Sequence, residues 1–380
     1  MSTILWACWD GGGNLTPSLG IARVLRERGH HVAFHGRPEM VPRVEAAGVP
    51  ATALANARAD LDRYSFHPLA GVFGYTSSPA VGDEVAGLVE AERPDLVVVD
   101  AMFAAALQVA PGFGRPTAVM LHTLCYRFID MWRENFEMQS QSRQRAGFAP
   151  SGDLDTLWGE RDLLQVNALA AFDGKPTVDW LNVAHGAPVL ASESRAVAVT
   201  LPWDEADPAP LVLLSFSTVT EQRDPAMLQR ALDALADLPV HVVGTTGGIV
   251  DPEELSCPGN AYLVPFADHD LLMARATLVL GHGGHGTTMR ALRAGLPIVG
   301  VPAKAGDQRP NLELVEELGA GLALPSDADV GQIRRAVQEV LADRRFADGA
   351  RRCSGSFGIV DGAELAADSL EMLLAAGVPG

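Results

Sequence analysis

Short apolar runs alternate with amphipathic stretches along the first half of the chain. Residues 2–8, 30–36, 94–101 and 115–123 each have the length of a buried strand, and the last two are almost continuously apolar. Such runs are typical of a parallel sheet that is covered on both faces. Between the first two runs, residues 18–29 carry apolar side chains at helical spacing and end on a glycine. This alternation predicts right-handed βαβ units and a doubly wound sheet.

The same alternation restarts after residues 200–210, a Pro-rich and acidic segment with the composition of a linker. Residues 125–180 are less regular and are expected to be helical with loops. Further strands are expected at residues 211–218, 240–248, 261–266, 276–284 and 297–303, with a helix at 225–238 and helices to the end. Since 380 residues exceed what one core usually serves, we expect two domains. The predicted fold is α/β, with two Rossmann-like, doubly wound domains facing across a cleft that holds the ligands.

Composition narrows the class of protein. Lys and Arg number 29 against 47 Asp and Glu, a net charge of −18, which disfavours a nucleic-acid binder. The four cysteines are scattered without a CxxC pair, as in a reduced, cytoplasmic protein. We expect no membrane segment and no signal peptide, because no apolar run is long enough and the start lacks a basic region and cleavage site.

The stretch VLGHGGHGTTMRAL, residues 279–292, joins a predicted strand to a predicted helix. Thr287 or Thr288 is the expected N-cap, and Gly295 the expected stop. Bare glycine backbone at a helix N-terminus favours an anion, most naturally a phosphate. Arg290 and other nearby cations outnumber the single acid between residues 276 and 311, which favours the same ligand.

Other interpretations of this loop remain open. The glycines would also serve a tight strand-to-helix turn. His282 and His285 would be a sparse zinc site, without a third ligand nearby. Gly281, Gly283 and Gly286 spell G-x-G-x-x-G, but the acid expected about 20 residues further on in a dinucleotide fold is missing.

Residues 282–321 resemble the donor-binding signature of the GT-B glycosyltransferases of family 1, in the spacing from His282 through Pro297 and Pro302 to Asp307. The resemblance implies the GT-B architecture and a division into four parts. These are an acceptor-binding domain at 1–200, the linker at 201–210, a donor-binding domain at 211–360, and a C-terminal helix at 361–380 that packs back on the first domain.

The resemblance also implies donor-site residues. His282 and the backbone that follows it would hold the diphosphate of a nucleoside diphosphate sugar, with Ser217 and Thr218 facing the same phosphates. Asp307 and Gln308 would bond the sugar hydroxyls. The complete implied set is His282, Gly283, Gly284, Gly286, Thr287, Thr288, Ser217, Thr218, Leu263, Val264, Asp307, Gln308 and Arg290.

The nucleobase and ribose positions complete the donor site. Leu263 would pack on the nucleobase and the backbone of Val264 would bond its edge. Arg290 stands where relatives carry a ribose-binding Glu, so dTDP is favoured over UDP. Alternatively, Arg290 points to solvent or to a phosphate.

The catalytic positions depart from the family pattern. The family's general base is a His three residues before a proline, and here Asn14 precedes Pro17. An amide has no useful basicity. Asp100 matches the family's partner acid, although Asp is also common as a helix cap. Asp100, Asp10 or His122 would then take the proton, unless the acceptor is an amine, an acidic phenol or a nucleophilic aromatic carbon.

The acceptor, too, has candidate contacts. Aromatic side chains in residues 64–75 and 126–136 are expected to line its pocket: Phe66, Phe73, Tyr75, Tyr126 and Trp132. D-x-D pairs begin at Asp60, Asp153 and Asp268, but each lies at a probable helix start, where Asp is favoured anyway. We therefore expect no metal and no cofactor, with the nucleotide sugar as co-substrate.

The sequence as a whole predicts an inverting glycosyltransferase of secondary metabolism and antibiotic biosynthesis. It would move a sugar from a dTDP or UDP sugar to a small lipophilic natural product, of aromatic polyketide, macrolide or enediyne type, through an O-, C- or N-linkage. Its partners would be this donor and this acceptor, with no nucleic acid and no membrane, and it would be a monomer or a homodimer. The alternatives are a nucleotide-sugar epimerase of the same fold and a non-catalytic nucleotide-sugar-binding partner of a second enzyme.

Overall fold

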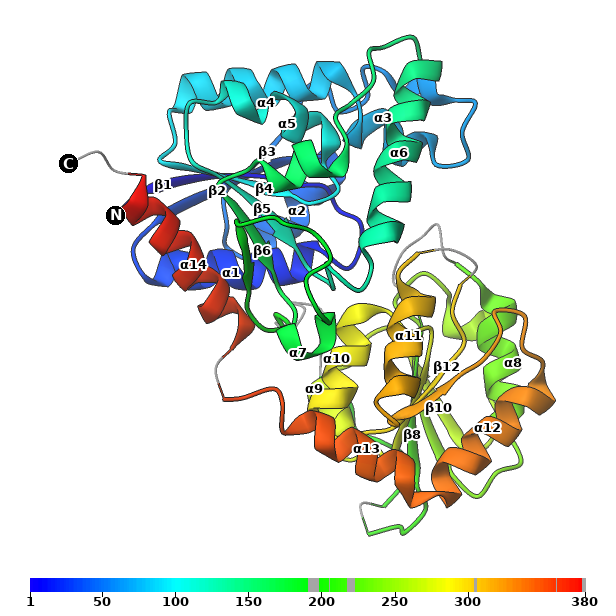
Figure 1. Ribbon diagram of the computed structural model, residues 1–380. Coiled ribbons are helices and arrows are strands. Elements are labelled where there is room, and N and C mark those ends of the chain that lie inside the picture. The colour runs from blue at the N-terminus through cyan, green and yellow to red at the C-terminus, as the bar shows by residue number, and fades with distance from the viewer. Residues whose placement is uncertain (191–197, 205, 217–222, 304–305, 360, 378–380) are drawn as a thin grey trace. The chain divides into compact units, whose positions relative to one another are not determined.

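The computed structural model divides the chain into two compact units, Met1–Ala191 with Val360–Gly380, and Ser192–Ile359 (Figure 1). It describes residues 1–190, 198–204, 206–216, 223–303, 306–359 and 361–377. Each unit is built on one parallel sheet. The prediction of two Rossmann-like α/β domains is confirmed.

The first unit has a seven-stranded parallel sheet of order β3-β2-β1-β4-β5-β6-β7. Its strands are β1 Thr3–Ala7, β2 His31–Gly36, β3 Ala51–Ala53, β4 Leu96–Asp100, β5 Thr117–Leu121, β6 Leu163–Val166 and β7 Val183–His185. Its helices are α1 Leu15–Glu27, α2 Val41–Ala46, α3 Ala70–Thr76, α4 Pro79–Glu92, α5 Ala104–Val109, α6 Ile129–Arg145, α7 Ala170–Asp173 and α14 Gly362–Ala376. Shorter helical turns are η1 Pro38–Met40, η2 Leu61–Tyr64, η3 Ala110–Gly112 and the π-type turn η4 Asp155–Gly159.

Apolar packing covers both faces of this sheet. Helices α1 and α14 lie on one face, and α4 and α5 lie on the other (Figure 1). Trp6 of β1 is fully buried and stacks on Phe34 of β2, with ring centroids 5.1 Å apart. The continuously apolar β4 and β5 are buried along their whole length, as a sheet covered on both sides requires.

The second unit has a six-stranded parallel sheet of order β10-β9-β8-β11-β12-β13. Its strands are β8 Leu211–Ser215, β9 His241–Thr245, β10 Ala261–Val264, β11 Leu278–Gly281, β12 Ile298–Gly300 and β13 Gly321–Ala323. Its helices are α8 Pro225–Leu235, α9 His269–Met273, α10 His285–Arg293, α11 Gln308–Glu317, α12 Val330–Ala342 and α13 Arg344–Ser354, with the turn η6 Pro252–Glu254. Helices α8 and α12 pack on one face, and α10 and α11 lie on the other (Figure 1).

Several elements differ from the sequence-based expectation. The strands β3, β6, β7 and β13 were not expected, because each has only three or four residues and carries no alternating or long apolar pattern. The expected N-cap at Thr287 or Thr288 is wrong, since α10 begins at His285 with Gly284 as N-cap. Gly283, at φ +84°, turns the chain into the helix early. Gly295, at φ +71°, ends this helix as predicted.

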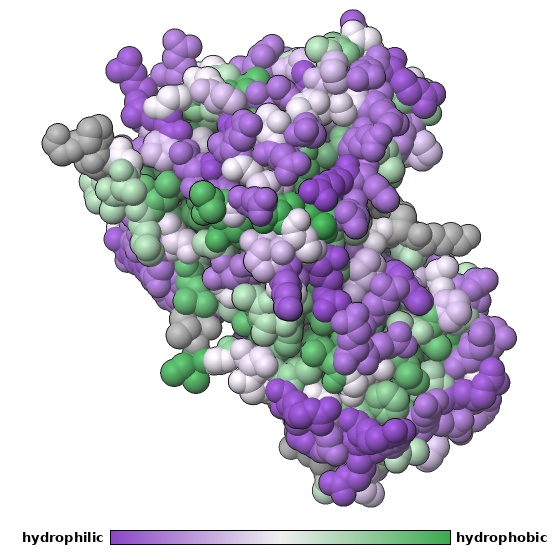
Figure 2. All heavy atoms as spheres, in the orientation of Figure 1, coloured by the Kyte–Doolittle hydropathy of each residue, from purple (hydrophilic) through white to green (hydrophobic). Residues whose placement is uncertain are grey.

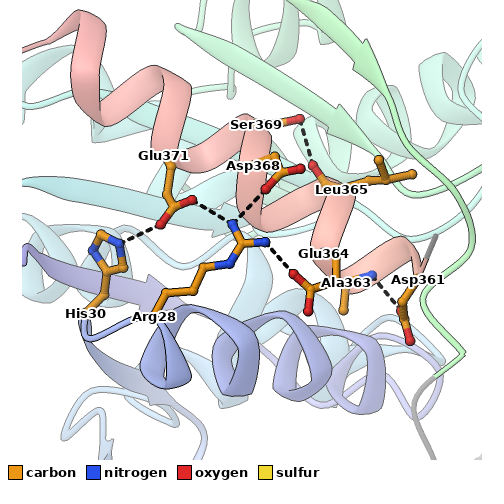
Figure 3. Close-up of polar contacts among 9 residues, drawn as sticks. All are labelled: Arg28, His30, Asp361, Ala363, Glu364, Leu365, Asp368, Ser369 and Glu371. Carbon is orange, nitrogen blue, oxygen red and sulfur yellow. Dashed lines mark hydrogen bonds and ion pairs between the residues drawn. The ribbon is translucent and has the colours of Figure 1, made fainter.

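The last helix returns to the first unit. Ala366 and Leu370 of α14 are fully buried in the same core as Leu25 of α1. At the rim of this contact, Arg28 bonds three carboxylates of α14: Glu364, Asp368 at 2.7 Å and Glu371 at 2.6 Å (Figure 3). The unit is therefore assembled from both ends of the chain.

Hydrophilic side chains cover most of the face drawn in Figure 2, notably over α12 and α13. Among the described helices, none combines the length and apolar character that crossing a bilayer requires.

Each sheet has one topological switch point, between β1 and β4 in the first unit and between β8 and β11 in the second. Ligands of open α/β sheets bind beside the carboxyl ends of the strands at such points. The described residues that follow β1 and β4, and those that follow β8 and β11, therefore mark the two candidate ligand sites.

Candidate functional site

The glycine loop after β11 lies at the switch point of the second sheet. A Cβ on Gly283 would come within 2.6 Å of Leu312 Cγ and 2.8 Å of the Gln308 carbonyl oxygen, so this glycine lets the loop lie directly against α11. A Cβ on Gly286 would meet nothing within 4 Å. Gly283 is therefore required by close packing against α11, whereas the space beside the Gly286 Cα is free of other protein atoms.

The first turn of α10 offers backbone donors beside that open space. The first bond within the helix runs from the Thr288 N–H to the Gly284 carbonyl at 3.0 Å. The N–H groups of Gly286 and Thr287 precede it and have no partner inside the helix. Together with the partial positive charge of the helix end, they form a site suited to a phosphate.

His282 stands at the entrance to this turn. Its Nδ1 lies 3.5 Å from the Ser215 carbonyl oxygen at the end of β8, and its ring stacks on Phe216 with centroids 6.2 Å apart. Burial lowers the pKa of His282 to about 4. The imidazole is therefore neutral near pH 7, and an anion beside it would favour its protonated form.

Arg290 forms an ion pair within the second unit, and its predicted place in the donor site stays a prediction. Its Nη1 bonds Asp270 Oδ2 of α9 at 2.8 Å, and Arg293 reaches the other oxygen of the same carboxylate at 3.2 Å. Because the Arg290 side chain is only 13% exposed, this pair is a fixed link between α9 and α10.

Asn311 ties α11 to the glycine loop, and Gln308 ties it to Ala303 after β12. Asn311 Nδ2 donates to the Gly283 carbonyl at 3.0 Å and to Asp307 Oδ2 at 3.2 Å. Gln308 is 3% exposed, and its Oε1 accepts from the Ala303 N–H at 2.6 Å. Burial raises the pKa of Asp307. Asn311 thus holds the glycine loop against α11, and the predicted contacts of Asp307 and Gln308 with sugar hydroxyls stay a prediction.

Two of the remaining residues predicted to bind the donor lie in β10. Leu263 and Val264 are half-buried in β10, and the Val264 carbonyl accepts from the Thr246 N–H at 3.0 Å. Ser217 and Thr218 lie outside the described residues.

Asn14 and Asp100 meet at the switch point of the first sheet. Asn14 Nδ2 donates to Asp100 Oδ2 at 2.8 Å and to the Trp9 carbonyl at 2.7 Å, while its Oδ1 accepts from the Gly11 N–H at 2.9 Å. Both N–H groups of the amide are thereby used. Asp100 also accepts from Trp9 Nε1 and from the Met102 N–H, each at 3.0 Å. It is 2% exposed, and burial raises its pKa to about 6.

The other two candidate bases, Asp10 and His122, are also hydrogen-bonded within the first unit. Asp10 bonds Arg43 at 3.1 Å and accepts from the Gly12 N–H at 3.0 Å. His122 Nδ1 lies 3.0 Å from Asn167 Nδ2, an amide donor, and Nε2 lies 2.8 Å from Ser18 Oγ. Since Nδ1 accepts, Nε2 carries the proton, and neither nitrogen is available for a substrate proton in this arrangement.

The aromatic candidates differ in exposure. Phe73 and Tyr75 are each 1% exposed, and the Tyr75 hydroxyl donates to the Cys8 carbonyl at 2.9 Å. Trp132 is 7% exposed, and its indole N–H bonds the Leu124 carbonyl at 3.0 Å. Tyr126 is 8% exposed, and Phe66 alone among the five exceeds a third, at 39%. As the structure stands, Phe73 and Tyr75 belong to the core and offer almost no surface to an acceptor.

Comparison with known proteins identifies the architecture. Residues 229–357 match the family described as erythromycin biosynthesis protein CIII-like, C-terminal domain. The calicheamicin glycosyltransferase CalG4 is 25% identical, with a TM-score of 0.76 over 100% of both chains. The fold is GT-B. The resemblance to GT-B glycosyltransferases of family 1 is therefore confirmed.

Two further similarities bear on this GT-B fold. A PGL/p-HBAD biosynthesis glycosyltransferase of Mycobacterium tuberculosis is 35% identical over 144 residues, which are 38% of this chain. The matched segment spans about a third of that relative, 33% of its length. The spinosyn rhamnosyltransferase SpnG, complexed with thymidine diphosphate, has a TM-score of 0.74 at 21% identity, over 98% of this chain and 100% of SpnG.

The first aspartate of each D-x-D pair accepts hydrogen bonds from nearby helix starts or loops. Asp268 accepts from the N–H groups of Asp270 and Leu271, Asp153 accepts from the Thr156 N–H at 2.9 Å, and Asp60 accepts from Ser78 Oγ at 2.6 Å. Within the described part of the chain, no three His, Cys, Asp or Glu side chains are grouped to hold a metal ion.

Sequence reasoning missed a second polar pair in the first unit. His185 Nε2 lies 2.7 Å from Asp173 Oδ2. His185 ends β7, a strand that was not expected, so nothing placed it at the carboxyl edge of the sheet. The only available signal was a histidine followed by Gly186 and Pro188, a turn composition that commonly ends a strand.

Proposed function

We propose that the chain is an inverting glycosyltransferase that moves a sugar from a dTDP or UDP sugar to a small lipophilic acceptor. The observation that carries this proposal is the open first turn of α10 at the carboxyl end of β11, within the segment that matches the CIII-like domain. CalG4 and SpnG, which have the same fold, are named for a calicheamicin and a spinosyn, and a structure of SpnG is complexed with thymidine diphosphate. These names support a natural-product acceptor and a pyrimidine nucleotide donor.

In this proposal the second unit activates the donor. The N–H groups of Gly286 and Thr287 and the helix dipole bind the diphosphate, and His282 adds a proton donor when the anion raises its pKa. Charge grows on the diphosphate as its bond to the anomeric carbon breaks, so these groups stabilise the transition state more than the ground state. Asp307 and Gln308 would contact the sugar from the start of α11. No metal ion is needed for this arrangement.

The first unit would hold the acceptor. Its nucleophilic atom attacks the anomeric carbon on the face opposite the diphosphate, which inverts the configuration in a single displacement. The proton of an attacking hydroxyl must leave during this step. Asn14 lacks basicity and Asp100 is shielded behind it, so we assign to Asp100 the positioning of Asn14 and the N-terminal loop.

The experiment is sugar transfer by the purified full chain. We expect glycosylated products by mass spectrometry from dTDP-glucose or UDP-glucose with a panel of phenolic and macrolide acceptors, and undiminished rates in EDTA. Activity lost in EDTA and restored by Mn²⁺ would contradict the metal-free proposal. Nucleotide binding without transfer to any acceptor would favour a non-catalytic nucleotide-sugar-binding protein. This alternative is considered because Asn14 stands at the position of the family's base and has no basicity.

A further inference from the structure

A carboxylate lies about one helical turn from the proposed diphosphate site. Gly286 and Arg290 are four residues apart in α10, so their Cβ positions share one face of this helix, about 5–6 Å apart. Arg290 Nη1 bonds Asp270 Oδ2 of α9 at 2.8 Å, and the two helices lie side by side in Figure 1. The open space at Gly286 and the carboxylate of Asp270 therefore flank the same face of α10.

Asp270 also lies at the carboxyl edge of the second sheet. His269, the first residue of α9, has its Nε2 3.1 Å from Thr245 Oγ1 at the end of β9. Strand β9 is the neighbour of β8, which borders the switch point. In the ladder Thr245 stands opposite Ser215, and Ser215 stands opposite Gly281, where β11 ends. The first turn of α9 is therefore held at the level at which the glycine loop leaves the sheet.

The carboxylate of Asp270 is fixed and can still accept hydrogen bonds. Arg290 bonds its Oδ2 at 2.8 Å, and Arg293 bonds its Oδ1 at 3.2 Å. An ionised carboxylate offers about four lone-pair sites. Since the Asp270 side chain is 40% exposed, the two arginines leave acceptor positions that a ligand can reach.

The same two arginines make an acid compatible with a diphosphate close by. An isolated carboxylate would repel this anion. Arg290 and Arg293 place two positive charges on the single negative charge of Asp270. The cluster therefore adds a hydrogen-bond acceptor to the site without making it acidic.

A nucleoside diphosphate carries a matching donor at this distance. Its ribose is joined to the diphosphate through the 5′-oxygen, so the ribose hydroxyls lie about one turn of an α-helix from the phosphate. Nucleotide-binding α/β folds recognise a ribose hydroxyl with a carboxylate near the phosphate-binding helix. The 3′-hydroxyl is the one that dTDP and UDP share.

We infer that Asp270 accepts a hydrogen bond from the ribose 3′-hydroxyl of the donor nucleotide and that Arg290 is its positioning residue. This inference rests on the proposed use of a nucleoside diphosphate sugar. It assigns recognition of the ribose to α9 and that of the diphosphate to the first turn of α10.

The test is calorimetry on the full chain with two nucleotides. One is whichever of dTDP or UDP the wild type binds, and the other is its analogue without the 3′-hydroxyl. We expect the wild type to bind the parent nucleotide about tenfold or more tighter than the analogue. Asp270→Ala should bind the two within about threefold of each other. Both nucleotides carry the same charge, so the loss of a negative charge from the site cancels in this ratio.

Further measurements separate the ribose contact from damage to the site. Asp270→Ala should bind inorganic pyrophosphate at least as tightly as the wild type does, because pyrophosphate has no ribose and the variant has one acid fewer. Arg290→Gln should lower the preference for the 3′-hydroxyl, whereas Arg290→Lys, which keeps a cation beside Asp270, should restore most of it. Melting curves report the folding of each variant.

Asp348→Ala is the matched control. Asp348 is 51% exposed and pairs with an arginine, Arg351. A Cβ on Gly295, which follows α10, would come within 3.3 Å of Arg351 Cγ, so this pair lies at the opposite end of α10 from the first turn. The variant should keep the wild-type preference for the 3′-hydroxyl.

The outcomes distinguish the inference from the proposed function. A preference for the 3′-hydroxyl that is absent from the wild type, or unchanged in Asp270→Ala, would overturn the ribose contact and leave the proposed function intact. Weaker pyrophosphate binding by Asp270→Ala would also overturn it, since the variant would then have disturbed the diphosphate site. An unchanged preference in Arg290→Gln would overturn the positioning role. A wild-type chain that binds neither dTDP nor UDP would reject the proposed function and the ribose contact with it.

Discussion

The amide of Asn14 uses its two N–H groups on the Trp9 carbonyl and on Asp100, and its carbonyl holds the Gly11 N–H. A residue so engaged orders the loop after β1. Asp100 in turn collects three donors around a carboxylate that burial disfavours. At the scale of single residues, this pair therefore fixes the loop after β1. The ionisation of Asp100 should make the free energy of unfolding of the first unit depend on pH.

Asp100→Asn should change how stability depends on pH. The pKa of Asp100 is raised from 3.8 to about 6 in the folded chain, so its protonated form favours folding below the unfolded pKa and this contribution is lost as the pH rises through 6. About two pKa units correspond to about 3 kcal/mol. Denaturant melts should show the wild type losing about this much relative to Asp100→Asn between about pH 4 and pH 7. A pH-independent difference would show that the carboxyl titrates alike in both states.

His282→Ala should weaken nucleotide binding in a pH-dependent way. A diphosphate beside His282 raises a pKa that burial has lowered to about 4, so binding takes up a proton. We expect the variant to lose about 1–3 kcal/mol of dTDP or UDP binding, the scale of a charge-assisted hydrogen bond. The loss should grow as the pH falls from 7 toward 5. Calorimetry on both proteins over this range cancels the protonation of the nucleotide itself, and identical affinities would exclude His282 from the phosphate site.

At the scale of elements, the first turn of α10 is both a helix start and the proposed anion site. These two roles favour different residues. A helix is destabilised by glycine relative to alanine by about 0.5–1 kcal/mol, yet an approaching phosphate needs bare backbone. Gly286 lies in this turn with open space around it, so packing does not require a glycine here and a bound phosphate would.

Gly286→Ala should therefore separate stability from binding. We expect the melting temperature to rise or stay unchanged, and dTDP or UDP affinity to fall about tenfold or more, because a methyl group takes the space of the diphosphate. Gly87→Ala in α4 is the control, since a Cβ there also meets nothing within 4 Å. It should gain the same stability and bind nucleotide as the wild type does. An unaltered affinity in Gly286→Ala would place the diphosphate elsewhere.

At the scale of the whole molecule, the chain uses its last helix to complete its first unit. Helix α14 adds fully buried side chains, among them Ala366 and Leu370, to a core that begins at β1. Around that seam Arg28 meets three carboxylates whose side chains are 33% to 56% exposed. Exposed ion pairs contribute little each, whereas buried apolar contacts contribute several kcal/mol.

Two variants should show which contact holds α14. Leu370→Ala leaves a cavity in the core and should destabilise the first unit by about 2–5 kcal/mol. Arg28→Ala should cost about 1 kcal/mol at low salt and less at high salt, because its pairs are screened. Denaturant melts at two salt concentrations provide the measurement. A larger loss from Arg28→Ala than from Leu370→Ala would make the ion cluster the principal attachment.

The sequence by itself determined the fold class, because long buried strands and amphipathic helices leave period signals that need no tertiary context. β1, β4, β5 and β8 are of this kind, and β11 lies within the longer apolar run at residues 276–281. It also singled out Asn14 and Asp100, whose side chains the structure joins at 2.8 Å across 86 residues.

Only the tertiary structure decided what could be reached by a ligand. Phe73 and Tyr75 have the residue types of a pocket wall, but packing on α3 makes them core. Arg290 pairs with Asp270 on another helix, and His185 ends a three-residue strand that no apolar run marks in the sequence. Exposure and side-chain partners depend on contacts between elements distant in sequence, and these are set when the sheets assemble.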